Sequence, residues 1–202
     1  MGYRNKIKPD YSIIEGLIPQ GSHVLDLGCG DGSLLSVLKE KKHVRGFGVD
    51  IYPEGLNQAM AKGLPVLELD LNQGLHSFKD GSFDFVVLNM TLQAVQNPLL
   101  VVKEMTRVGK KAIVGFPNFG HWRLLFQLLI SERMPKTKTL PYEWYNTPNI
   151  RLMTVRDFRV LCRDNGIKIL KETFLGENGK QLSGSFMSWR AVEGVFLLEK
   201  ND

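Results

Sequence analysis

Residues 23–33 read HVLDLGCGDGS, and this stretch decides the fold class. Its first five residues form a short apolar run, which is typical of a strand buried inside a sheet. Glycines then occupy alternate positions, at Gly28, Gly30 and Gly32, and glycine allows the backbone to turn sharply and to approach a ligand closely. Residues 33–41 carry their apolar side chains on one helical face. The stretch therefore predicts a strand, a tight loop and the start of a helix.

The same alternation of short apolar runs and helical segments continues along the chain. Strands are expected at 23–27, 44–49, 65–69, 83–88, 112–116, 167–174 and 194–199, and helices at 33–41, 54–61, 98–108, 124–130 and 155–165. Thr154 and Asp157 are typical of a helix N-terminus, and Gly166 of a helix C-terminus. Strands that alternate with helices at this spacing indicate a doubly wound α/β fold, with helices on both faces of a mostly parallel seven-stranded sheet.

Length and composition restrict the class of protein further. The chain has 202 residues, of which 43% are hydrophobic and 23% are charged, so we expect residues 1–202 to form a single globular domain. The two cysteines, Cys29 and Cys162, cannot form a disulfide framework, which favours a reducing compartment. The four histidines are scattered along the chain, so no structural metal is expected.

Targeting signals and charge restrict the expected location and partners of the protein. Residues 1–12 lack the apolar core of a signal peptide, and the longest charge-free stretch, 85–102, is too polar for a membrane helix. A cytoplasmic protein with no membrane contact is therefore expected. Residues 1–100 carry a net charge of −2 and residues 101–202 a net charge of +7, which indicates either an anion-binding surface or an ordinary solvated basic face. No basic run is interleaved with aromatic residues, so no nucleic-acid partner is expected.

The glycine loop indicates a particular kind of ligand. A helix N-terminus offers unpaired N–H groups, and dinucleotide-binding loops of the form G-x-G-x-x-G use them to hold a pyrophosphate. Here Ser33 stands at the sixth position, and the acid Asp26 precedes the loop, where it would repel a pyrophosphate. A nucleotide-binding oxidoreductase is therefore disfavoured. An acid at this place suits a ligand that carries an ammonium group, such as S-adenosylmethionine.

Two more acids follow the next two predicted strands. Asp50 stands where a carboxylate can accept hydrogen bonds from both ribose hydroxyls, 22 residues after Gly28. Asp70 ends the third strand, where it could accept from an adenine amino group beside the backbone of Leu71. Because all three acids lie at the carboxyl edge of one sheet, they favour an adenosyl-binding site. The alternative is a glycine turn with two helix-capping aspartates.

The stretch between the fifth predicted strand and the last predicted helix departs from the alternation of strands and helices. This insertion, residues 117–151, contains four prolines and an unusual density of Trp, Tyr and Phe. Long irregular stretches between core elements are more often functional than idle. The insertion could be a lid over a small substrate, a docking surface for another protein, or a subdomain that covers the sheet edge. Residues 124–130 are too apolar for an isolated lid, so they should pack on the body or on a partner.

Several strings carry a resemblance to a known family. The loop and its flanking acids are similar to those of class I S-adenosylmethionine-dependent methyltransferases. More narrowly, VLDLGCGDGSLL, TLQAV, FPNFGHW, RMP, LPYEWYNTPNI and DFRVLC resemble the MetW family of methionine biosynthesis proteins, over nearly the whole chain. The resemblance implies the Rossmann-like class I methyltransferase fold with an aromatic-rich insertion after the fifth strand. It also implies a homoserine O-acyltransferase, MetX, as the partner that the protein supports or regulates.

The resemblance also assigns positions in the cofactor site. Asp26, Gly28, Cys29 and Gly30 would contact the methionyl part of S-adenosylmethionine or S-adenosylhomocysteine, Asp50 and Ile51 the ribose, and Asp70 and Leu71 the adenine. Asn89 would border the same pocket. The family pattern has a Ser-Gln pair where this chain has Asn89-Met90, and an acid where Asn72 stands.

Methyl transfer itself needs more than a cofactor site. A poor nucleophile needs a base of suitable pKa, and the tail of the fourth strand, residues 89–93, offers no side chain that titrates near neutral pH. The remaining candidates are His121 and Tyr145 in the insertion, although His121 could equally pack the insertion onto the body. A regulatory adenosyl-binding protein is therefore favoured, and an active small-molecule methyltransferase is the alternative.

Overall fold

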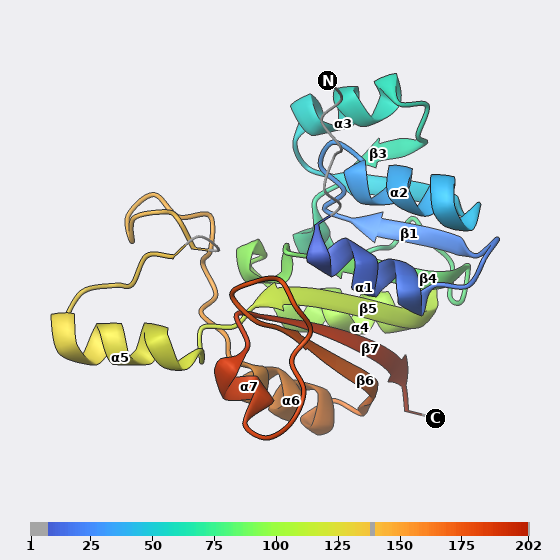
Figure 1. Ribbon diagram of the computed structural model, residues 1–202. Coiled ribbons are helices and arrows are strands. Elements are labelled where there is room, and N and C mark those ends of the chain that lie inside the picture. Colours follow the sequence, from blue (N-terminus) through green and yellow to red (C-terminus); the bar gives the residue numbers. More distant parts are fainter. Residues whose placement is uncertain (1–7, 138–139, 202) are drawn as a thin grey trace, which may run out of the picture.

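The computed structural model describes residues 8–137 and 140–201. Seven strands form one sheet in the order β3-β2-β1-β4-β5-β7-β6, in which β7 alone runs antiparallel to its neighbours (Figure 1). The strands are β1 (His23–Leu27), β2 (Arg45–Asp50), β3 (Val66–Glu68), β4 (Phe83–Asn89), β5 (Gly109–Pro117), β6 (Ile167–Leu175) and β7 (Glu193–Lys200). The predicted seven-stranded, mostly parallel sheet is confirmed.

Helices cover both faces of the sheet. They are α1 (Pro9–Leu17), α2 (Ser33–Lys42), α3 (Pro53–Ala61), α4 (Pro98–Val108), α5 (Trp122–Ser131), α6 (Val155–Asp164) and α7 (Met187–Arg190), with short 3₁₀ helices η1 (Leu71–Gln73) and η2 (Leu92–Ala94). One apolar cluster joins the sheet to α1, α2 and α3, and a second joins it to α4 and α6. The five predicted helices are present, whereas α1, α7 and the 3₁₀ helices were not predicted.

Local sequence explains where the elements begin and end. The Thr154 hydroxyl accepts from the N–H of Asp157 at 3.1 Å while the Asp157 carboxylate accepts from the N–H of Thr154 at 3.0 Å, so the predicted capping box starts α6. Gly166 follows this helix with φ of +64°, a conformation that glycine adopts without steric cost. The helix signal that was missed for α1 is Pro9 at its first turn.

The strand register gathers several strand ends at one edge of the sheet. Leu27 pairs with Val49 of β2 and with Leu88 of β4. The loop after β1 therefore lies beside the ends of both neighbours. Because β7 is antiparallel, its first residue, Glu193, pairs with the last residue of β5 at this same edge. We call this the carboxyl edge.

The insertion leaves the sheet at the carboxyl edge too. It begins where β5 ends and returns to the core at α6, and α5 lies within it. Figure 1 shows α5 standing away from the sheet, at the far side of the molecule from α3. Only Leu124 of this helix is buried.

Candidate ligand site at the carboxyl edge

The glycine loop is held against β2 by backbone hydrogen bonds. The N–H groups of Gly28 and Cys29 both donate to the carbonyl of Val49, at 2.8 and 3.0 Å. Gly28, Gly30 and Gly32 all have positive φ values, of 71°, 52° and 72°. Residues other than glycine rarely adopt positive φ values without strain. The backbone of this loop therefore requires glycine at these three alternate positions.

Two of these glycines face different surroundings. A Cβ added to Gly28 would lie 2.5 Å from the hydroxyl oxygen of Thr91, which shows that the tail of β4 packs directly on the loop. A Cβ added to Gly30 would meet no described atom within 4 Å. Space beside Gly30 is therefore open to a ligand.

Asp50 is fixed in place by the loop. Its Oδ2 accepts from the N–H of Gly30 at 2.8 Å, and its Oδ1 accepts from the N–H of Tyr52 at 3.0 Å. A carboxylate has about four lone-pair sites, so acceptor capacity is left over for hydroxyl groups of a ligand. Ile51, next to it, is exposed, as a residue flanking a ligand would be.

Asp26 is the most unusual residue of this edge. Its side chain is only 3% exposed, and within the described ranges no hydrogen bond reaches its carboxylate. Burial, and then the charge of Asp50, raise the pKa of Asp26 to about 8. Burial and the charge of Asp26 raise the pKa of the Cys29 thiol to about 12, so Cys29 is a neutral part of the wall and no nucleophile.

Asp70 and Leu71 continue the edge with different roles. Asp70 Oδ1 accepts from the backbone N–H and the side-chain amide of Asn72, both at 2.9 Å, and so caps η1. That bond is the capping role that the sequence left open as an alternative. The N–H of Leu69 donates to the carbonyl of Asp50 at 2.9 Å, which keeps this segment beside β2. The Leu71 side chain is buried in the core, so only its backbone is free to meet a ligand.

Asn89, at the end of β4, connects this edge to α1. Its Nδ2 donates to Oδ2 of Asp10 at 2.7 Å, and Asp10 is buried. Its Oδ1 is buried and has no hydrogen-bond partner in the part of the chain that the structure describes. Buried polar atoms without partners are rare and ask for an explanation, of which a missing ligand is one.

The carboxyl edge also holds acids that sequence reasoning missed. The tail of β4 lacks a titratable group, as predicted, but α1 and β7 supply Asp10 and Glu193. Burial, and then the charge of Asp10, raise the pKa of Glu193 to about 7. No local pattern could have shown this, because Asp10, Asn89 and Glu193 are brought together only by the topology of the sheet.

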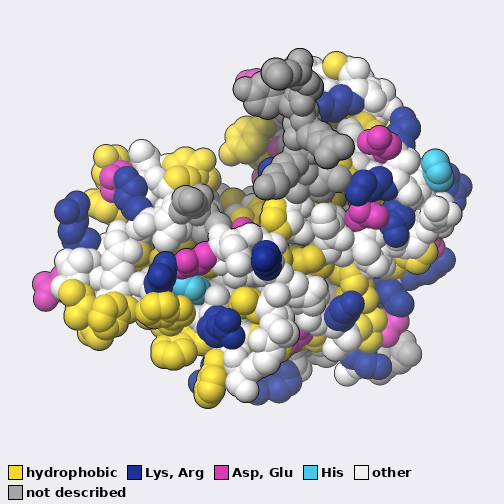
Figure 2. Space-filling view, in the orientation of Figure 1, with side chains coloured by type: hydrophobic (Ala, Val, Ile, Leu, Met, Phe, Trp, Pro, Cys, Tyr) yellow, Lys and Arg dark blue, Asp and Glu magenta, His cyan; other side chains and the backbone are white. Residues whose placement is uncertain are grey.

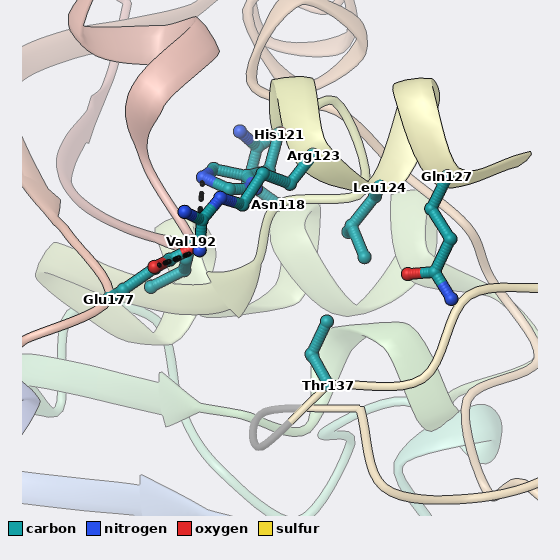
Figure 3. A pocket seen from close by; sticks show the side chains of 8 residues that line it. All are labelled: Asn118, His121, Arg123, Leu124, Gln127, Thr137, Glu177 and Val192. Atoms are coloured by element: carbon teal, nitrogen blue, oxygen red, sulfur yellow. Dashed lines mark hydrogen bonds and ion pairs between the residues drawn. The ribbon is translucent and has the colours of Figure 1, made fainter. Parts of the chain in front are cut away.

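His121 lies at the base of the insertion. Its ring is buried, with Nε2 3.9 Å from Glu177, a residue that also pairs with Arg123 at 2.8 Å (Figure 3). Burial lowers the pKa of His121, against the opposing charge of Glu177. It lines a cavity of about 420 Å³ together with Asn118, Leu124 and other residues of the insertion's base. A packing role and a role in binding both fit this position.

Tyr145 lies farther out in the insertion. Its side chain is 70% exposed and meets the ring of Trp144 at 5.6 Å between centroids. Both rings line a wide hollow of about 930 Å³ that α5 residues close from the other side. The catalytic roles of Tyr145 and His121 stay predictions.

The described residues contain neither a candidate metal centre nor a helix that could cross a membrane. Across 8–137 and 140–201, no three His, Cys, Asp or Glu side chains are grouped so that they could hold a metal ion. Over these residues, too, every helix is too short or too polar to cross a membrane.

Comparisons with solved structures show the fold. The chain superposes on a SAM-dependent methyltransferase from Archaeoglobus fulgidus with a TM-score of 0.72, at 16% identity, covering 98% of this chain and 95% of that one. A possible histamine N-methyltransferase from Thermotoga maritima gives 0.68 at 21% identity, covering 96% and 88%. The predicted class I methyltransferase fold is confirmed.

Sequence comparisons show the family. The chain is 41% identical over 172 residues to the "Bifunctional methionine biosynthesis protein MetXA/MetW" of Rhodopirellula baltica, which covers 81% of this chain but only 27% of that protein. It is 32% identical over 169 residues to an uncharacterized protein of Methanocaldococcus jannaschii, covering 82% of this chain and 74% of that one. The family model described as "Methionine biosynthesis protein MetW" matches residues 8–198. The chain therefore belongs to the MetW family of methionine biosynthesis proteins.

Proposed function

We propose that this protein binds S-adenosylmethionine or S-adenosylhomocysteine at the carboxyl edge and supports or regulates a homoserine O-acyltransferase, MetX, through its insertion. The observation that carries the ligand proposal is the pairing of two carboxylates on either side of the glycine loop. Asp50 is fixed by hydrogen bonds, and Asp26 is buried and without a hydrogen-bond partner among residues 8–137 and 140–201. The first suits hydroxyl groups and the second suits a cationic group.

Other features of the carboxyl edge fit an adenosyl ligand. No described atom fills the space beside Gly30, and the Oδ1 of Asn89, which has no partner among the described residues, can accept from a ligand donor. Asp26, Gly28, Cys29 and Gly30 would hold the methionyl part, Asp50 and Ile51 the ribose, and Asp70 with the Leu71 backbone the adenine. When bound, S-adenosylmethionine would supply an electrophilic methyl group; the residues named here bind and orient it.

The partner proposal rests on the insertion and on one relative. In the Rhodopirellula baltica protein, a MetW-like segment is part of the same chain as MetXA, by that protein's name. Fusion in one organism favours association of separate chains in another. In this chain, α5 exposes large apolar side chains, and Figure 2 shows them gathered over that helix. They are Trp122, Leu125, Phe126, Leu128, Leu129 and Ile130, and we call them the α5 apolar face.

The α5 apolar face supports docking better than it supports a closed lid. Large contiguous apolar patches on a surface mark interaction sites, and interface cores favour aromatic residues. A MetW chain that binds an end product of the pathway and contacts an early enzyme could carry a feedback signal. Such coupling must be reciprocal in free energy. Both cysteines are buried free thiols, which suits the cytoplasmic location we propose.

One experiment tests both parts of the proposal. The protein and the homoserine O-acyltransferase of the same organism are purified together and apart, with and without S-adenosylmethionine. We expect co-purification, and an acyltransferase activity that depends on both the MetW chain and the added ligand. No association, with unchanged activity, would refute the partner role, and no heat of binding in calorimetry would refute the ligand. A methyl-transfer product in an assay with labelled S-adenosylmethionine would instead favour the alternative, an active methyltransferase.

A further inference from the structure

Several acidic side chains from different elements lie along the carboxyl edge. Asp26 comes from β1, Asp10 from α1 and Glu193 from β7; Asp26 and Asp10 are buried, and Glu193 is partly buried. The hydrogen bond from Asn89 to Asp10 holds α1 over the end of β4, and Thr91 holds the β4 tail against Gly28. Along this edge, Asp26 therefore lies near the end of β1, Asp10 lies against the end of β4, and Glu193 pairs with the end of β5.

The acids of this edge interact in two pairs, Asp10 with Glu193 and Asp26 with Asp50, and Tyr11 feels the charge of both pairs. Asp10 raises the pKa of Glu193, Asp50 raises that of Asp26, and Asp26 and Asp10 both raise that of Tyr11. Interactions of this kind require short separations or a low dielectric. The ligand-free edge is thus an unfavourable concentration of negative charge that a cation would relieve.

Among residues 8–137 and 140–201, few positive groups counter this charge. The titratable and charged groups that face the cluster are Lys8, Asp10 and Tyr11 at α1, Asp26, Cys29 and Asp31 at β1 and its loop, Asp50 at β2 and Glu193 at β7. Lys62 pairs with Asp31 at 2.7 Å. Lys8 acts on Glu193, but its ammonium group lies over the Tyr11 ring, 5.2 Å from the centroid. Asp26 itself has no cationic or hydrogen-bonding partner among the residues described.

We propose that Asp10, Asp26 and Glu193 make the carboxyl edge selective for the cationic sulfonium of S-adenosylmethionine over the neutral thioether of S-adenosylhomocysteine. This inference rests on the proposed adenosyl site and adds what that site distinguishes. The two ligands differ by one methyl group and one positive charge. A site that responds to the charge of the sulfonium would bind mainly S-adenosylmethionine. The signal passed to a partner would then follow the concentration of the methyl donor and not the total concentration of the two adenosyl ligands.

Charge explains such selectivity better than shape. Loss of one methyl group from a hydrophobic contact changes affinity by a modest factor, whereas a full charge near several carboxylates acts over a longer range. The first expected result is that S-adenosylmethionine binds the unmodified protein at least about tenfold more tightly than S-adenosylhomocysteine, in calorimetry at pH 8, where Glu193 is mostly ionised and Asp26 is about half ionised.

Two neutralising variants test the cause. Asp10→Asn keeps an oxygen that can accept from Asn89, and Glu193→Gln keeps the shape of the side chain, so both remove charge with little change of structure. Each should reduce the ratio of the two affinities about threefold or more, mainly by weakening S-adenosylmethionine. Glu199→Gln is the matched control, because it removes the same charge at the opposite end of β7 and should leave the ratio unchanged.

Proton release gives an independent readout. A cation beside Asp26 and Glu193 favours their charged forms, so at pH 7 the binding of S-adenosylmethionine should release protons, and that of S-adenosylhomocysteine fewer. The heats measured in buffers of different ionisation enthalpy report this number directly. Glu193→Gln should lower it.

The outcomes separate this inference from the proposed function. If neither ligand binds, both the adenosyl site and its selectivity are wrong. If both ligands bind with equal affinity and equal proton release, the adenosyl site stands and the selectivity is overturned. A preference for S-adenosylmethionine that survives both Asp10→Asn and Glu193→Gln would also overturn the role given to these carboxylates.

Discussion

The side-chain oxygen of Asn118 accepts a hydrogen bond from the backbone N–H of Val155 at 3.2 Å. Asn118 follows β5 and Val155 begins α6, so this bond closes the base of the insertion. The same side chain donates through Nδ2 to the carbonyls of Ser188 and Ala191, at 2.7 and 2.8 Å. One buried amide therefore fixes the two ends of the insertion and α7 relative to one another.

Removal of this amide should weaken the whole fold. Asn118→Ala leaves two buried backbone groups, the N–H of Val155 and the carbonyl of Ala191, and two partly buried ones without these bonds. Each buried group left without a partner costs about 1–3 kcal/mol. Because local rearrangement will recover some of these bonds, we expect the free energy of unfolding to fall by about 2–4 kcal/mol in urea denaturation. Gln127→Ala, on the exposed surface of α5, is the control and should change it by less than about 0.5 kcal/mol. Equal stability of the two variants would show that Asn118 does not hold the insertion.

The α5 apolar face makes a second prediction. Leu129 is 76% exposed, so Leu129→Glu should leave the free energy of unfolding within about 0.5 kcal/mol of its original value. It places a charge at the centre of the proposed interface, where we expect the affinity for the homoserine O-acyltransferase to fall at least about tenfold. Surface plasmon resonance measures this affinity.

The control for this substitution lies on another helix. Met60→Glu introduces the same charge at an exposed position of α3, which Figure 1 places far from α5. It should bind the acyltransferase as well as the unmodified chain does. If Leu129→Glu also binds normally, the partner contacts some other surface, or none.

Much of the fold was predictable because its signals are local. The glycine loop, the capping box of Thr154 and the apolar faces of the helices each depend on residues within one turn or one strand. The α1 helix is not predicted from the sequence, because its N-cap residue, Lys8, makes no side-chain capping hydrogen bond and its apolar face is short. The short 3₁₀ helix η1 gives a weak signal for a related reason: it has only three residues, and its cap, Asp70, also fits a ligand contact at the end of a predicted strand.

The candidate site was predictable only in part, for a topological reason. Asp26, Asp50 and Asp70 each lie at or beside the carboxyl end of a strand, so a βαβ pattern is enough to place them at one edge. Asp10 reaches Asn89 across 79 positions of sequence, and Glu193 joins them only because β7 runs antiparallel. Such contacts depend on how distant segments pack in the completed sheet. Local sequence patterns therefore do not predict them.

Asp50 offers a direct test of the adenosyl site. Asp50→Ala removes the acceptor for the N–H groups of Gly30 and Tyr52 as well as the proposed acceptor for ribose hydroxyls. The affinity for S-adenosylmethionine should therefore fall by about 1–3 kcal/mol in calorimetry. Asp164→Ala, an exposed acid in the last turn of α6, should bind as before. Unchanged affinity in Asp50→Ala would place the ligand elsewhere.

Asp26 predicts an unusual pH dependence of stability. Its pKa is raised to about 8 in the folded protein, whereas an unfolded aspartate titrates near pH 4 (about 3.9). Between these values the folded state holds more protons than the unfolded state, so the free energy of unfolding of the ligand-free protein should fall as pH rises from about 4 to about 8 and then level off. Glu193, with its pKa raised to about 7, adds a contribution of the same sign.

The substitution Asp26→Asn isolates this effect, because a neutral amide needs no proton to remain buried. Urea denaturation at pH 6, 7 and 8 without ligand should show a smaller loss of stability for Asp26→Asn than for the unmodified chain. The difference should be about 2 kcal/mol over this range, since each pH unit below the folded pKa corresponds to about 1.36 kcal/mol. His121 interferes little, because its lowered pKa matters only below about pH 6.5, where its effect has the opposite sign. Parallel curves for the two proteins would mean that Asp26 is already ionised at pH 6, and that the buried acid at the end of β1 is stabilised by something other than its proton.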